Sequence, residues 1–222
     1  MDEQYVKTLE SVVKQMLCRL RDLPFHLVVE SLSGRKVIPF DTQDSDDRQL
    51  LGLLKRVAQA AGESVNRNPI VRPRPNEVGN DIEPFVKQAL RDLGHPAETP
   101  TCTSGQKKST GYPDIETRDA AGRPFYIECK TYNKDNVGTT QRSFYLSPSE
   151  ESKVTNDGHH FALSYEIYTD GRSGEGNIYK CRHWKILDLH GLLVDVKYEF
   201  NSDNARLYSG TLTLAEGSIQ ES

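Results

Sequence analysis

The chain has 222 residues, 36% hydrophobic and 27% charged, so it is long enough to bury one large core or two small ones. Its formal net charge of −4 at pH 7 argues against a uniformly basic surface, although basic residues cluster locally. The sequence contains no long apolar run, no secretory signal and no closely spaced cysteines, which excludes a membrane span and predicts reduced thiols in the cytoplasm.

Residues 1–65 are predicted to form an N-terminal subdomain, a hairpin between two helices. Apolar residues recur every three or four positions over residues 2–22, which is typical of one helix face. Residues 24–40 predict two short strands around Ser33 and Gly34. A second amphipathic helix follows and is expected to stop near Gly62. This helix-hairpin-helix-like segment carries no recognisable catalytic motif.

Residues 66–79 contain three prolines and three arginines, and we predict a basic linker at an internal boundary. Two interpretations stay open for this segment. It is either a plain linker or a basic arm that lies along a phosphate backbone.

Residues 80–215 are predicted to form the main domain, followed by a frayed tail at 216–222. Its first helix is expected to end at Gly94 and to begin with a capping box of Asn80 and Glu83. Strand-like runs follow the helix. This order predicts an α/β (α+β) fold, in which helices flank a mixed central β-sheet.

A turn centred on Ala121 separates two strands, so residues 112–130 are predicted to form a β-hairpin. This turn places Asp114 opposite Glu128, and a change of turn type would shift the pairing by one residue. Side chains paired on one face have Cβ atoms about 4.5–5.5 Å apart. Lys130 shares the face of Glu128 because side chains alternate along a strand. The other side chains of the second strand are expected to face the core: Phe125, Ile127 and Cys129.

Two carboxylates this close repel each other where water is scarce, and a divalent cation removes the repulsion. Mg²⁺ binds one or two carboxylates and keeps water and phosphate oxygens as further ligands. A neighbouring lysine can orient a water or stabilise charge on a phosphate. The pattern therefore predicts a metal site at Asp114 and Glu128, with Lys130 serving the chemistry. The alternative is a hairpin with a merely charged outer face, in which Lys130 pairs with one of the acids.

The combination of Pro113-Asp114, thirteen residues, and Glu128-Cys129-Lys130 resembles the PD-(D/E)xK signature of restriction-endonuclease-like nucleases. Members of this superfamily often carry a further acid on a helix before the hairpin. Glu83 matches that place, and Glu77 is the alternative. The resemblance covers about residues 76–200, and the size of the chain is most similar to that of a type II restriction endonuclease.

The resemblance implies a site-specific endonuclease that hydrolyses double-stranded DNA and leaves 5′-phosphate and 3′-hydroxyl ends. Asp114 and Glu128 would ligate Mg²⁺, for which Mn²⁺ can substitute, together with the backbone carbonyl of Cys129. Lys130 would orient the attacking water, and Glu83 would assist. A homodimer is expected because a two-fold protein matches a palindromic site. A cognate DNA methyltransferase would protect the DNA of a prokaryotic host.

Several side chains have the chemistry to contact bases or phosphates, although each could also be an ordinary surface group. These candidates are Arg72, Arg74, Lys107, Lys108, Asn133, Lys134 and Arg142. The spacing of His159, His160, Cys181 and His183 disfavours a zinc site. Two rival functions remain: a repair, junction or phage-defence nuclease without strict specificity, and a non-catalytic DNA-binding domain on the same fold.

Overall fold

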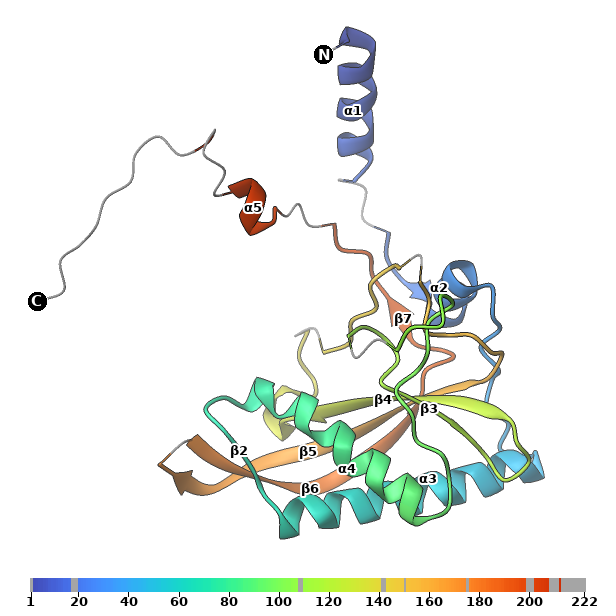
Figure 1. Ribbon diagram of the computed structural model, residues 1–222, viewed down its shortest axis with the longest axis vertical. Coiled ribbons are helices and arrows are strands. Elements are labelled where there is room, and N and C mark those ends of the chain that lie inside the picture. The colour runs from blue at the N-terminus through green and yellow to red at the C-terminus, as the bar shows by residue number, and fades with distance from the viewer. Residues whose placement is uncertain are drawn as a thin grey trace, which may run out of the picture. The chain divides into compact units, whose positions relative to one another are not determined.

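The computed structural model describes residues 2–16, 20–107, 110–140, 143–149, 151–174, 176–198, 202–207 and 212 (Figure 1). It divides into two compact units. One is Leu23–Val194, and the other combines Met1–Asp22 with Asp195–Ser222. Among the described helices, none is long and apolar enough to cross a membrane.

The smaller unit contains helices α1 (Glu3–Gln15) and α5 (Asn204–Leu207). The side chain of Asp2 caps α1 by accepting a hydrogen bond from the backbone N–H of Gln4 at 3.1 Å. This helix is shorter than the predicted span of residues 2–22 and buries none of its residues.

The larger unit is built on a mixed five-stranded sheet with the strand order β2-β6-β5-β4-β3. The strands are β2 (Ile70–Arg72), β3 (Ile115–Arg118), β4 (Pro124–Tyr132), β5 (His159–Ser173) and β6 (Gly176–Asp188). β4 and β5 are parallel, and the other neighbours are antiparallel. A small second sheet pairs β1 (Leu23–Pro24) with β7 (Leu193–Val194). The predicted mixed sheet with flanking helices is confirmed.

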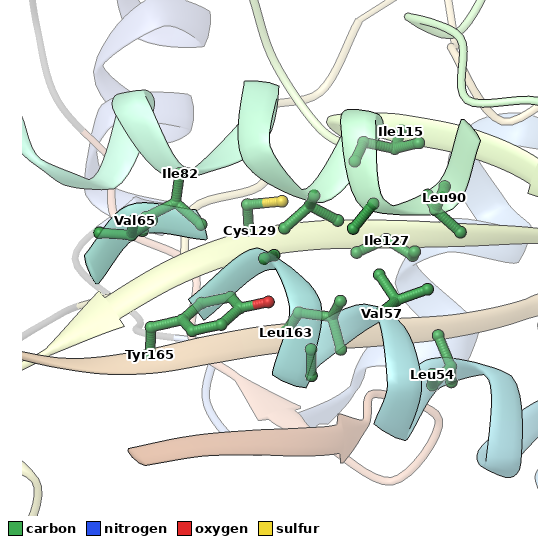
Figure 2. Close-up of a cluster of buried hydrophobic side chains, with 14 of the residues drawn as sticks. Leu54, Val57, Val65, Ile82, Leu90, Ile115, Ile127, Cys129, Leu163 and Tyr165 are labelled. Carbon is green, nitrogen blue, oxygen red and sulfur yellow. The ribbon is translucent and has the colours of Figure 1, made fainter. Parts of the chain in front are cut away.

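Helices α3 (Ser45–Arg67) and α4 (Gly79–Asp92) cover one face of this sheet (Figure 1). The main core fills the space between the helices and the sheet, as Figure 2 shows. Alternate residues of β4 and β5 point into it, and fully burying one such side chain contributes about 1.5–3 kcal/mol. The buried strand residues are Phe125, Ile127, Cys129, Phe161, Leu163, Tyr165 and Ile167. The predicted inward face of β4 is confirmed.

A second hydrophobic cluster contains Tyr126 of β4 and Ala162 of β5, whose positions alternate with those of the main core. Phe25 and Val29 of helix α2 (Phe25–Ser33) pack in this cluster. Glu128 lies two residues beyond Tyr126 and therefore shares its face of β4.

The hairpin predicted for residues 24–40 is wrong, because residues 25–33 form α2. Phe25, Val29 and Leu32 have helical spacing, and the adjacent valines misleadingly suggested a strand. Gly34 adopts φ 68° and donates its N–H to the carbonyl of Glu30 at 2.9 Å. It therefore ends a helix instead of turning a hairpin.

Other predicted boundaries also differ from the structure. α3 continues past Gly62 to Arg67, and residues on both sides of Gly62, Ala61 and Val65, are buried in the core. Residues 66–79, expected to be a linker, contain β2 and the 3-10 helix η1 (Pro75–Glu77). α4 begins at Gly79 without a side-chain cap, so the Asn80 capping box is wrong.

Candidate active site

The β3–β4 hairpin brings the two predicted carboxylates together. Ile115 pairs with Ile127, and this register places Asp114 opposite Glu128, as predicted. Oδ2 of Asp114 accepts a hydrogen bond from the backbone N–H of Cys129 at 2.8 Å. Asp114 directly precedes β3, so this hydrogen bond of its side chain holds it against β4.

Glu128 is buried, with 5% of its surface exposed, and only one of its two carboxylate oxygens has a partner among the described residues. Oε1 lies 2.7 Å from Nζ of Lys130, whereas the buried Oε2 has no hydrogen-bond partner among the described residues. Burial and the Asp114 carboxylate raise the pKa of Glu128 to about 7, although Lys130 opposes the rise. Burial also raises the pKa of Asp114, and the charge of Glu83 raises it further against the Cys129 N–H. Each of the two carboxylates therefore makes the other harder to ionise.

Helix α4 contributes the third acid. Glu83 accepts from Nζ of Lys87 one helical turn later at 2.5 Å, and the same ammonium donates to Oγ1 of Thr99 at 2.7 Å. The negative charge of Glu83 contributes to the raised pKa of Asp114. Glu77, the alternative, lies in η1 and acts on Arg72. The structure thus brings Glu83 to the hairpin carboxylates.

Sequence reasoning missed a buried lysine at this cluster, Lys153. It is 4% exposed and donates from Nζ to the carbonyl of Gly111 at 2.6 Å. Burial lowers the pKa of Lys153, while Asp114, Glu128 and Glu83 oppose the shift. Lys153 belongs to no helix or strand, so neither periodicity nor motif spacing could have identified it.

The donor atoms suit a hard divalent cation. Carboxylate oxygens are the ligands that Mg²⁺ prefers, and it completes its shell with water and phosphate oxygens. The unpartnered Oε2 of Glu128 fits such an ion, because an unsatisfied buried carboxylate oxygen is costly. Among the described residues, no group of three or more His, Cys, Asp and Glu side chains could hold a metal. A bound ion would therefore need further oxygens, from the backbone, water or phosphate, in addition to the two carboxylates.

Comparison with known proteins identifies the chain. The family model described as type II restriction enzyme MjaV family matches residues 18–211. The chain belongs to this family. It is 35% identical over 234 residues to the type II restriction enzyme MjaV of Methanocaldococcus jannaschii, with 99% of both chains covered. No solved structure matches.

Membership of the MjaV family makes the protein a type II restriction endonuclease, a hydrolase that cuts DNA at specific sites. The predicted restriction-endonuclease class is confirmed. The rival interpretations as a non-catalytic domain or a nuclease without specificity are not those that the family supports.

Of the residues predicted to contact DNA in this MjaV-family enzyme, some have partners within the protein and others are exposed. Arg72 donates to both carboxylate oxygens of Asp81 at 2.7 and 2.6 Å, and Lys107 pairs with Glu98 at 2.9 Å. The side chain of Asn133 caps η2 (Lys134–Asn136) by accepting from the N–H of Asp135. Arg74 and Lys134 are exposed. The remaining two predictions, Lys108 and Arg142, lie outside the described residues.

The histidines near the start of β5 have partners of their own. Nε2 of His159 lies 3.2 Å from Oδ1 of Asp47, and Nδ1 of His160 lies 2.5 Å from the hydroxyl of Tyr112. Burial lowers the pKa of His160 to about 3, so its ring is neutral. The strand register pairs Cys181 with Ile167, well along β5 from the two histidines.

Proposed function

We propose that this MjaV-family enzyme cleaves DNA with a divalent cation, Mg²⁺ or Mn²⁺, held by Asp114, Glu128 and the backbone carbonyl of Cys129. One observation carries the proposal: Glu128 is a buried carboxylate, faces a second carboxylate and has an oxygen without a partner among the described residues. When bound, the cation would neutralise phosphate charge and make a coordinated water more acidic.

Lys130 is proposed to orient the attacking water and to stabilise the charge that develops on the phosphate. Its ammonium is held by Glu128 at 2.7 Å and lies 5.7 Å from the centre of the Phe144 ring, which restricts its position. Glu83 assists from α4. The water oxygen bonds to phosphorus as the bond to the 3′-oxygen breaks, so the products carry 5′-phosphate and 3′-hydroxyl ends.

The DNA itself is proposed to be held by basic and amide side chains around the hairpin. The proposed contacts are Arg72, Arg74, Lys107, Lys108, Asn133, Lys134 and Arg142. Arg74 and Lys134 are exposed, which supports their role as phosphate contacts. Arg72 would have to exchange or share the carboxylate of Asp81.

We further propose a homodimer, because a two-fold protein matches a palindromic DNA site. The free thiols of Cys102, Cys129 and Cys181 suit the cytoplasm, where thiols stay reduced. A host that makes such an enzyme must protect its own sites, so a DNA methyltransferase of the same specificity is the expected partner.

The test is a digest of unmethylated phage DNA by the full-length protein, with Mg²⁺ or with EDTA. Discrete fragments are expected only with the metal, and Lys130→Ala should abolish them. Lys55→Ala is the matched control, because Lys55 is an exposed lysine on the outer part of α3. The fragments should accept a labelled 5′-phosphate from a kinase only after phosphatase treatment. Full cleavage in EDTA, or by Lys130→Ala, would contradict the proposed site.

A further inference from the structure

The carboxylate cluster contains three acids and three lysines, and only two of each are paired directly. Lys130 pairs with Glu128 at 2.7 Å, and Lys87 pairs with Glu83 at 2.5 Å. Asp114 is the acid that remains, and it accepts a hydrogen bond from the backbone N–H of Cys129. The lysine that remains is Lys153, which forms no ion pair within the described residues.

Lys153 is unusual because lysine is almost never this buried without a specific partner. Its hydrogen bond to the carbonyl of Gly111 uses one of three ammonium protons. The negative charges that attract it most are those of Asp114, Glu128 and Glu83. The ammonium is thus retained beside the carboxylates at the expense of hydration.

The bond to Gly111 also controls the backbone that leads to Asp114. Gly111 adopts φ 83°, a left-handed conformation that favours glycine, and lies three residues before Asp114. The intervening Tyr112 is held by its hydroxyl contact with His160 at 2.5 Å. Lys153 and His160 therefore anchor the entry to β3 on two successive residues.

We propose that Lys153 is a positioning residue of the active site, one that the PD-(D/E)xK signature does not include. It supplies the third positive charge of the cluster, and it holds the entry to β3 through Gly111. The inference rests on the proposed function of the two carboxylates as metal ligands.

Loss of this lysine has two consequences. A cation that stabilises the ionised carboxylates is lost, and the backbone that carries Asp114 is freed from one anchor. Metal binding weakens and cleavage slows, because the two ligand carboxylates are no longer held ionised and in place for the ion. Binding of DNA without metal stays unchanged, because a side chain that is 4% exposed does not present its charge to a phosphate backbone.

The experiment compares Lys153→Met, Lys153→Gln and Lys153→Arg with the wild-type protein, with Lys55→Met as the control for an exposed lysine. The measurements are Mn²⁺ binding to the DNA-free protein by electron paramagnetic resonance, single-turnover cleavage, DNA affinity in EDTA, and Tm. Lys153→Met should weaken Mn²⁺ binding and slow cleavage by about 10- to 100-fold, which is typical when a residue that holds metal ligands in place is replaced. DNA affinity should stay the same, and Lys153→Arg should recover part of both losses.

Lys153→Gln keeps a donor for Gly111 without the charge, and it decides the matter if the methionine variant does not fold. Wild-type Mn²⁺ affinity in a folded Lys153→Gln protein would overturn the role of the charge. Lys130→Ala, measured in parallel, separates the two proposals. If Lys130→Ala is inactive and Lys153→Gln is normal, only the present inference fails. If Lys130→Ala cleaves normally, the proposed active site itself fails.

Discussion

Replacement of Glu128 by glutamine should make the metal-free protein more stable above neutral pH. The wild-type carboxyl has a pKa of about 7, raised from an ordinary value of 4.5 by burial and by Asp114. Since each pH unit between these values corresponds to about 1.4 kcal/mol, the folded state favours the protonated form by about 3 kcal/mol. Glutamine has the shape of the protonated carboxyl and cannot ionise.

The direction in which the free energy of unfolding changes with pH follows from proton binding. The folded protein holds the Glu128 proton more tightly than the unfolded chain, so the stabilisation is complete below about pH 4.5 and is lost as pH rises through about 7. The free energy of unfolding of the wild-type protein should therefore fall between pH 5.5 and 8.5 relative to that of Glu128→Gln. The gap should widen to about 3 kcal/mol at the upper end.

Urea unfolding in EDTA at four pH values measures this gap. Glu166→Gln on β5 is the matched control, because it removes a carboxylate that is equally buried, 6% against 5%, outside the cluster. Added Mg²⁺ should then stabilise the wild-type protein at pH 8.5 and leave Glu128→Gln unchanged, since a ligand stabilises only the state that binds it. Parallel pH profiles of the wild type and Glu128→Gln would refute the reasoning about this carboxyl.

Three further outcomes are expected. Gly158→Ala should lower the free energy of unfolding by at least about 2 kcal/mol, because its Cβ would lie 2.4 Å from the carbonyl oxygen of Pro124. Gly191→Ala, with no atom within 4 Å, should have little effect in the same urea assay, and equal losses would contradict the argument. Asp47→Ala should cost about 3 kcal/mol in that assay, since this buried carboxylate binds the Arg123 guanidinium at 2.8 Å, and unaltered stability would refute it. Arg74→Ala should weaken DNA binding similarly on all sequences and reduce the slope of log affinity against log salt by about 1, whereas an unchanged slope would remove Arg74 from the phosphate contacts.

The part of the site that the residue pattern alone predicts lies on one hairpin, whereas Glu83 of α4 follows from the family resemblance. The turn fixes the register, the register opposes Asp114 and Glu128, and alternation along β4 adds Lys130. Each step uses neighbours in the chain. Lys153 is different, because its carbonyl partner lies 42 residues earlier and neither residue belongs to a helix or strand. No local pattern encodes such a contact.

The wrong prediction at residues 24–40 has a related cause. Phe25 and Val29 suit a strand or a helix by composition, and tertiary packing decides between them. In the structure they pack with Tyr126 and Ala162 in the second cluster, and a helix buries both side chains there because they lie four residues apart on one helix face. β2 was missed for the same reason: its pairing with β6 is the contact that orders a segment rich in proline and arginine.

The two faces of β4 explain why core and site depend on each other. Ile127 and Cys129 are buried against the helices, while Glu128 and Lys130 alternate with them on the other face. A shift of one residue in the pairing would exchange the faces, burying the charged side chains in the apolar core and exposing the apolar ones. The hydrophobic effect that holds Ile127 inward is therefore the same force that sets Glu128 opposite Asp114.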